Sequence, residues 1–320
     1  MNSPEAKGAA DNWPALPFEE WRETLATVHM WTQVVGKVRL AQAPHVNHWW
    51  QVPLYVTPRG LTTSPMPSGQ RTFQIDFDFI GHRLRIETHE GDARELALAP
   101  RTVADFYGEF MSRMGELGLD VKVWTTPVEV ENPIPFEQDE THKSYDAEYV
   151  ERFRRALVQA DRVFQRFRSG FAGKCSPVHF FWGSFDLAVT RFSGRPAPRH
   201  PGGIPNLPDA ITREAYSHEV SSAGFWPGGA MGGEPMFYSY AYPAPEGFSA
   251  AAVEPREARW DAALGEFVLG YADVRGAPDP EARLLAFLAS TYAAAADLAR
   301  WDRAALECPV GRPGTPREVE

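Results

Sequence analysis

Two segments of this 320-residue chain carry the same helical pattern, and this repetition constrains the fold more than any other feature. The matching positions, all 132 residues apart, are Trp21, Leu25, Val28, Thr32 and Val35 in the first segment and Phe153, Leu157, Ala160, Phe164 and Phe167 in the second. The spacing predicts two amphipathic helices. A Gly-Lys pair follows each, at 36–37 and 173–174, and we expect the glycine to end the helix because it adopts left-handed backbone without strain.

The order of features after each helix also recurs. A histidine opens a ring-rich strand in both copies, His48 in HWWQVPLYVT and His179 in HFFWGSFDLAVT. Later in each half, ELAL and EFVL precede segments with apolar residues at helical spacing. Between them, RTFQIDFDFIGHRLRIET alternates as a half-buried strand pair that turns at Gly81, and PMFYSYAYPAPEGF is its expected counterpart.

These patterns predict an α+β protein built from an internally duplicated helix–antiparallel sheet–helix unit. We expect the two sheets to pack around a pseudo-twofold axis with the helices outside. The first repeat would span residues 13–135 and the second 145–306, with 1–12 and 309–320 as disordered tails. The alternative is that two unrelated α+β segments align by chance.

Composition narrows the class of partner. A formal charge of −10 and a pI near 5.5 argue against nucleic acid or an anionic membrane as the main partner, and we expect a small-molecule ligand instead. Two cysteines, Cys175 and Cys308, are too few for a disulfide framework or a four-thiolate zinc site. Without a signal-peptide pattern or a long apolar run, a cytoplasmic protein is expected.

The stretch SPVHFFWGSFDLAVTRFSGR, residues 176–195, places charged side chains on a ring-rich strand. In an unbroken strand His179 and Arg191 share one face and Asp186 lies on the other, unless a bulge at Gly183 moves Asp186 to the histidine's face. Burial on such a wall would shift a pKa toward values useful in catalysis. The alternative is a core histidine bonded to backbone, with Asp186 fixing the strand register.

Further titratable residues lie in REAYSHEVSSAGFWPGG, where His218 and Glu219 are adjacent and therefore point to opposite faces of a strand. With His48 and His179 they offer a two-histidine, one-carboxylate metal site, a metal-free acid–base pair, or structural contacts, and the spacing does not choose between these. A metal pair of His45 and His48 is disfavoured, because residues three apart on an extended chain diverge.

Candidate roles follow from these residue types. The catalytic candidates are His179, His218, Glu219 and Asp186, with a histidine as general acid or base and a carboxylate to orient it. The candidates for substrate binding are His48, Arg59, Arg191, Trp50, Trp182 and Trp226. The two arginines follow equivalent strands and would clamp an anionic group, or else serve as surface charges.

Two Gly- and Pro-rich segments, 195–209 and 224–242, are expected to act as mobile lid loops over the site. Their glycines match neither a phosphate-binding loop nor a nucleophile elbow, and no motif in the chain specifies a cofactor.

Four long stretches, residues 13–41, 46–65, 173–198 and 213–229, closely resemble a bacterial family of full-length proteins that is known only as a domain of unknown function. The resemblance runs from about Trp13 to about Leu306 and implies one self-contained unit. It implies no activity, cofactor or catalytic residue.

The leading hypothesis is an enzyme that acts on a small, partly apolar or aromatic molecule in a cleft between the two halves. The competing hypothesis is a non-catalytic small-molecule binder or sensor. Such a binder would have the same aromatic cavity, but its polar groups would be fully hydrogen-bonded and unperturbed.

Overall fold

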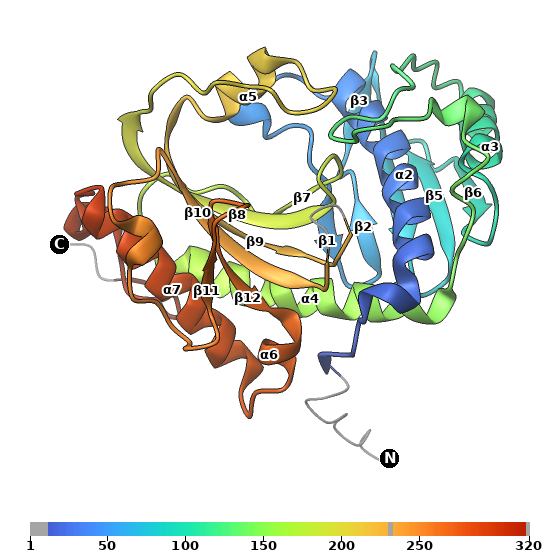
Figure 1. The fold of residues 1–320 in the computed structure, drawn as a ribbon. Coiled ribbons are helices and arrows are strands. Elements are labelled where there is room, and N and C mark those ends of the chain that lie inside the picture. Colours follow the sequence, from blue (N-terminus) through green and yellow to red (C-terminus); the bar gives the residue numbers. More distant parts are fainter. Residues whose placement is uncertain (1–11, 230–232, 318–320) are drawn as a thin grey trace.

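Two antiparallel sheets of six strands each form the framework of the computed structural model, which describes residues 12–229 and 233–317 (Figure 1). The first sheet has the order β1 (Tyr55–Thr57), β2 (Gly60–Thr62), β4 (Arg71–Asp78), β5 (Arg83–Thr88) and β6 (Ala93–Ala97), with β3 (Met66–Ser68) also paired to β4. The second has the order β11 (Arg259–Asp261), β12 (Glu266–Gly270), β10 (Met236–Tyr242), β9 (His218–Trp226), β8 (Asp186–Pro196) and β7 (His179–Phe181). The predicted α+β class is confirmed.

Among the described residues, one backbone bridge joins the two sheets edge to edge. The Leu54 amide donates to the Phe180 carbonyl at 2.9 Å, and the Phe180 amide donates to the Leu54 carbonyl at 2.8 Å. The bridge joins the edges that carry β1 and β7, so the halves lie side by side along one seam. The predicted duplication, its pseudo-twofold axis and the boundaries at 13–135 and 145–306 stay predictions.

Helix α4 (Ala147–Ser169) has the predicted amphipathic pattern. The Asp146 side chain caps its first turn by accepting hydrogen bonds from the backbone amides of Glu148 and Tyr149. All five positions predicted to face the core are buried, and this face packs against β8 and α7 (Pro280–Leu298). The helix ends at Ser169, before the predicted stop at Gly173, and Gly170 takes the cap position.

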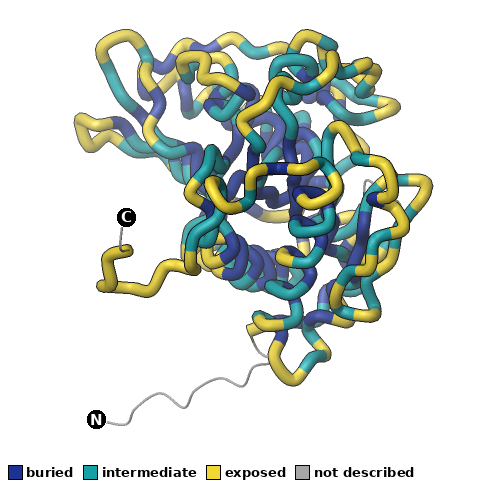
Figure 2. The backbone as a smooth tube through the Cα atoms, turned by 90° about the vertical axis from the view of Figure 1, so that its left-hand side faces the viewer, coloured by how far each residue is buried: buried dark blue, intermediate teal, exposed yellow. Residues whose placement is uncertain are grey.

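Helix α2 (Phe18–Gln42) is buried on all sides along its second half. The prediction of an amphipathic helix on the outside of the sheets is therefore wrong for this segment. Every residue from Thr27 to Arg39 is buried, and the helix contacts α3 (Val103–Glu116), α4 and β3. Buried backbone gathers at the centre of the molecule and exposed backbone at its rim (Figure 2). The apolar stripe was real, but tertiary packing also covers the opposite face.

The expected helix stop at Gly36 is also wrong, because α2 continues to Gln42. A Cβ atom at Gly36 would lie 2.3 Å from ring carbons of Trp182, in the turn between β7 and β8. The glycine is therefore required for close approach of this ring to the helix backbone. The Trp182 indole also donates a hydrogen bond to the Val52 carbonyl at 2.9 Å, which joins the turn to the segment before β1.

Among the strand predictions, the β4–β5 hairpin is confirmed, with Asp78 opposite Arg83 and Gly81 in the turn. His179 opens β7 as expected, but His48 lies in the short 3₁₀ helix η1 (Asn47–Trp49) with a φ of 60°. The segment 224–242 is mostly strand in β9 and β10 rather than loop, and residues 230–232 lie outside the described part.

The remaining helices are short: α5 (Asp209–Ala215), α6 (Tyr271–Arg275), α8 (Arg303–Leu306), η2 (Phe136–Gln138) and η3 (Phe248–Ala250). No helix in the described part of the chain combines the length and apolar character needed to cross a membrane. Of the predicted tails, residues 309–317 are exposed, and 1–11 and 318–320 lie outside the described residues.

We predict that Gly36→Ala lowers the free energy of unfolding by about 1–3 kcal/mol, because the added methyl group must displace the Trp182 ring. Gly108→Ala is the matched control in α3, since no atom lies within 4 Å of an added Cβ there. The control should gain up to about 1 kcal/mol from better helix propensity. Urea unfolding of both variants checks this, and equal stabilisation would show that Trp182 is free to move away.

Candidate functional site

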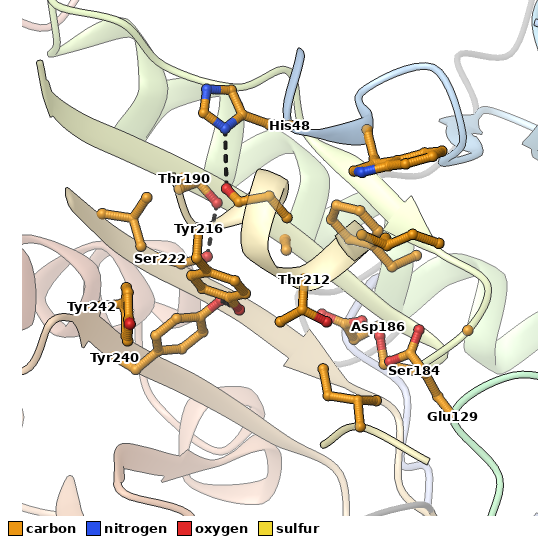
Figure 3. Close-up of a pocket in the computed structure, with 18 of the residues that line it drawn as sticks. His48, Glu129, Ser184, Asp186, Thr190, Thr212, Tyr216, Ser222, Tyr240 and Tyr242 are labelled. Carbon is orange, nitrogen blue, oxygen red and sulfur yellow. Dashed lines mark hydrogen bonds between the residues drawn. The ribbon is translucent and has the colours of Figure 1, made fainter. Parts of the chain in front are cut away.

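A cavity of about 480 Å³ lies over one face of the second sheet. Its floor is formed by alternate residues of β8, namely Asp186, Ala188, Thr190 and Phe192, together with side chains from β9 and β10. The intervening residues point to the other face, which packs on α4 and α7. The walls come from residues 48–52, from 128–129 and from the chain through α5 (Figures 1 and 3).

A tight hairpin brings Asp186 into this cavity. The sequence predicted either an unbroken strand or a strand with a bulge at Gly183, but the chain reverses between Phe181 and Asp186, which pair directly. Opposite residues of an antiparallel pair share a face. Asp186 therefore lies on the same face as His179, as a bulge would have placed it, but for a different reason.

The Asp186 carboxylate is buried, with 4% of the residue exposed. It accepts hydrogen bonds from the Ser184 hydroxyl and from the Tyr238 phenol. Burial raises the pKa of Asp186 to about 6, although both hydrogen bonds act in the opposite direction. The group therefore changes protonation close to neutral pH.

A second carboxyl, Glu129, comes from the irregular segment between the two halves. Its backbone has a φ of 59°, which is unusual for a residue with a side chain. Its carboxylate lies against the Gly183 backbone, where a Cβ would be 2.0 Å from Oε1. Burial, followed by the negative charge of Asp186, raises the pKa of Glu129 to about 7.

A third carboxyl, Glu266, begins β12 and lines the same cavity. Its Oε2 atom is buried and has no hydrogen-bond partner in the described part of the structure. Burial, and then the charges of Asp186 and Asp261, raise the pKa of Glu266 to about 8. Three carboxyls in one cavity thus have raised pKa values.

Polar side chains of α2 position the two segments that lie next to Glu129 and Asp186. The Nε2–H of His29 donates to the Gly183 carbonyl at 2.8 Å, and burial lowers the pKa of this histidine to about 4, which keeps it neutral. Gln33 donates to the Val128 carbonyl at 2.8 Å and accepts from the Val128 amide at 3.0 Å. Glu129 and Ser184 are therefore fixed by the central helix.

Aromatic rings form much of the remaining wall. The Trp226 and Tyr238 rings have centroids 4.3 Å apart, and the phenols of Tyr216 and Tyr240 are hydrogen-bonded at 2.6 Å. Gly224 permits the Tyr238 ring to lie over β9, since a Cβ there would be 2.3 Å from the ring. Figure 3 shows Tyr216, Tyr240 and Tyr242 gathered on the side of the cavity away from Glu129.

His48 lines the cavity, but both of its ring nitrogens are engaged. Its Nδ1–H donates to the Ala215 carbonyl at 3.0 Å, so Nε2 accepts from the Lys174 ammonium at 2.5 Å. Burial, and then the Lys174 charge among other contacts, lowers the pKa of His48. The backbone amide of His48 also donates to Glu214 at 2.7 Å, which ties η1 to α5.

Five of the residues predicted from sequence line this cavity: Asp186, His48, Trp50, Trp182 and Trp226. His179 is buried beside Tyr55 and Trp50 and does not line it. Burial, followed by the charges of Arg39 and Arg168, lowers the pKa of His179 to about 3. The His218 ring contacts the His48 ring at 5.6 Å but is also absent from the cavity wall.

Glu219 is not placed to orient a histidine. Its carboxylate pairs with Arg195 at 2.7 Å and accepts from the Ser193 hydroxyl at 2.8 Å. It lines a separate hollow of about 220 Å³, on the opposite side of β9 from His218, as adjacency on a strand requires.

The expected pair of arginine clamps does not form. Arg59 is at the surface and pairs with Asp78 at 2.6 Å in the first sheet. Arg191 is buried beneath the second sheet, where its guanidinium lies 3.5 Å from the centroid of the Phe167 ring. Neither side chain lines the cavity.

The histidines and Glu219 likewise do not converge as a metal site. In the ranges 12–229 and 233–317, no group of three or more histidine, cysteine, aspartate or glutamate side chains has an arrangement that could hold a metal ion. The two-histidine, one-carboxylate arrangement considered from the sequence is therefore not formed by these residues.

Sequence reasoning missed Glu129, Glu266 and the helix residues that position the site. Glu266 had been noticed only as part of EFVL, the strand that precedes the last long helix. His29 and Gln33 carried a usable signal, because polar side chains on an otherwise apolar helix need partners in the core. Glu129 lies in an irregular segment and had no periodic signal.

We predict that Glu266→Gln flattens the dependence of stability on pH. Folding raises the pKa of this carboxyl from 4.5 to about 8, so the folded state keeps the proton longer and the free energy of unfolding falls as pH rises through that range. The fall is at most about 1.4 kcal/mol per pH unit for one carboxyl.

Denaturant unfolding between pH 5 and pH 8 measures this effect as the difference between the free energies of unfolding of the variant and the wild type. The difference is needed because the buried histidines make the stability of both proteins rise with pH. Glu219→Gln is the control and should keep the wild-type slope, because it removes a carboxylate that lies outside the cavity. Parallel curves for Glu266→Gln and the wild type would contradict the prediction.

Comparison with known proteins gives a family but no function. No curated protein matches the chain, and no solved structure matches it. The model of a family of unknown function, DUF5996, matches residues 13–308, which is nearly the full length. The chain therefore belongs to the family of unknown function DUF5996.

Proposed function

We propose that the cavity is the active site of an enzyme that acts on a small, partly apolar or aromatic molecule by acid–base catalysis. The observation that carries this proposal is the pair Asp186 and Glu129, whose pKa values are raised to about 6 and about 7 in the same cavity. Proton transfer is most efficient when the pKa of the catalytic group lies near the working pH.

The surroundings of the two carboxyls suggest different roles. Asp186 receives hydrogen bonds from Ser184 and Tyr238, which favour its ionised form, so it serves as the general base. Glu129 has the higher pKa and lies beside the charge of Asp186, so it holds a proton more readily and serves as the general acid.

The cavity suits a small molecule in size and surface. Its volume of about 480 Å³ falls within the usual range for ligand sites. Apolar wall residues include Phe181, Ile204, Leu207 and Ile211, and they supply surface for an apolar body. Segment 195–209, expected from sequence to be a mobile lid, contributes two of these side chains, Ile204 and Leu207, and its mobility stays a prediction.

Acid–base roles for histidine are less well supported than they were from the sequence. Both nitrogens of His48 are hydrogen-bonded, and His179 lies outside the cavity with a pKa far below neutral. His218 is within ring contact of His48 but does not line the wall. The carboxyls take over the role first assigned to the histidines.

The competing function is a non-catalytic binder or sensor. The two hydrogen bonds that satisfy Asp186 favour it, since a binding protein has no need of reactive groups. Two observations argue against a binder. The cavity carboxyls have raised pKa values, and buried oxygens of Glu266 and Thr212 have no partner in the described structure. These features favour the enzyme.

We predict that Asp186→Asn slows turnover strongly while the fold is kept. Small-molecule extracts incubated with the protein and followed by mass spectrometry should show compounds consumed by the wild type. The variant should consume them about 10²–10⁴-fold more slowly, the usual loss for a missing acid–base group. Glu219→Gln, outside the cavity, should match the wild type.

Circular dichroism and melting temperature verify that both variants are folded. If the wild type consumes nothing but retains compounds from the extract in equilibrium dialysis, the binder is the correct function. If Asp186→Asn consumes the same compounds at the wild-type rate, Asp186 is not a catalytic residue.

A further inference from the structure

We propose that the ligand of this cavity is an organic cation, an amine or quaternary ammonium group on an apolar body, held between the three carboxyls and the aromatic rings. The inference rests on the proposed function only in that the cavity takes up a small molecule. It does not depend on catalysis.

The cavity wall has acidic side chains but no lysine or arginine among its described residues. Its ionisable side chains are Glu129, Asp186, Glu266, His48 and His200 and four tyrosines. The charged groups that act on Glu129 and Glu266 are also acidic, namely Asp186 for both and Asp261 for Glu266. No lysine or arginine in the described wall therefore neutralises them, and their charge disfavours an anionic ligand, although the buried indole N–H groups of Trp49 and Trp226 also have no partner among the described residues.

The basic residues nearest to this region are already paired. Lys174 donates to His48, and its ammonium lies 5.3 Å from the centroid of the Trp50 ring and 5.0 Å from that of Phe192. Arg195 pairs with Glu219 in the separate hollow. Lys174 thus shows, at one end of the cavity, how the rings of this wall hold an ammonium group.

The carboxyl end of the cavity offers the same kind of surface without an occupant from the protein. The ring centroids of Trp226 and Tyr238 are 4.3 Å apart, and Tyr238 stacks on Tyr240 at 6.1 Å. Tyr238 also donates to Asp186, so an electron-rich ring and a carboxylate meet at one point. Aromatic faces and carboxylates both attract a cation.

Unpartnered oxygens point to a missing donor. The Thr212 hydroxyl is buried, with 2% of the residue exposed, and it has no hydrogen-bond partner among the described residues. Figure 3 shows it on the side of the cavity that holds Ser184, Asp186 and Glu129. Buried polar atoms are nearly always hydrogen-bonded. A protonated amine of a ligand would supply N–H donors for Thr212 and for the free Glu266 oxygen, whereas a quaternary ammonium group would offer them only its charge.

The carboxyls also make the expected binding dependent on pH. Among the other titratable groups of the wall, burial raises the pKa values of Tyr216, Tyr238 and Tyr240 and lowers those of His48 and His200, so these shifts lead away from neutral pH. A cation favours the ionised carboxyls and therefore expels protons when it binds. Affinity should rise with pH between about 5.5 and 8.

The experiment compares cations with neutral molecules of the same shape by isothermal titration calorimetry. The pairs are choline with 3,3-dimethylbutan-1-ol, and phenethylamine with 2-phenylethanol. We expect each cation to bind at least about tenfold more tightly than its neutral partner at pH 8. Choline, whose charge is permanent, should also bind at least about tenfold more tightly at pH 8 than at pH 5.5.

Variants assign the effect to the carboxyls. Glu266→Gln and Glu129→Gln should each weaken cation binding by about tenfold and leave the neutral partner unchanged. Glu219→Gln has the same chemistry outside the cavity and should bind as the wild type does. Two separate glutamine variants keep the test informative if one of them fails to fold.

Equal binding of a cation and its neutral partner would overturn the inference but leave the cavity as a ligand site. Absence of binding by all four compounds at concentrations up to about 10 mM would also overturn it, since even a weak cation site would have a Kd below this concentration. The proposed catalysis fails by a different observation, the absence of any compound consumed by the wild type but spared by Asp186→Asn.

Discussion

The burial of α2 is the constraint on which the rest of the structure depends. A helix covered on all sides cannot leave its polar side chains in water, so each must find a partner inside the protein. His29 and Gln33 find theirs in the backbones of Gly183 and Val128. The same helix lies against Trp182 at Gly36. The packing of one helix thereby fixes the two segments that lie next to Glu129 and Asp186.

The cavity is held in an arrangement that costs stability. Three carboxyls with raised pKa values line a cavity that has no lysine or arginine in its described wall, and Glu129, His48 and Trp49 have positive φ values of 59°, 60° and 60°. Backbone strain of this kind persists only where the surrounding contacts are strong, and it gathers at functional sites. The central helix and the η1–α5 hydrogen bonds supply those contacts, which is why the polar groups remain where a core built for stability alone would have apolar ones.

The sequence predicted those features that leave a periodic or local pattern of residue types. The amphipathic α4, the β4–β5 hairpin and the cavity residues Asp186 and Trp182 follow from local spacing and composition. The burial of α2 on all sides could not be predicted, because its apolar stripe is the same whether the rest of the protein covers one face of the helix or all of them. Glu129 could not be found either, since its position depends on a positive φ in an irregular segment and on a hydrogen bond to a helix 95 residues away.

The sign of the ligand's charge depends on the side-chain alternation of one strand. Residues 186, 188, 190 and 192 of β8 line the cavity, whereas Arg191 points to the helices and stacks on Phe167 and Tyr292. Asp186 and Arg191 are an odd number of positions apart, so a regular strand cannot bring both to one site. The sequence already placed them on opposite faces, and an anion clamp that used Arg191 beside Asp186 was inconsistent with that spacing. The sheet thus separates its charges: the arginine lies among the helices on one face and the carboxyls lie on the other. There a cationic ligand would balance the charge of the carboxyls.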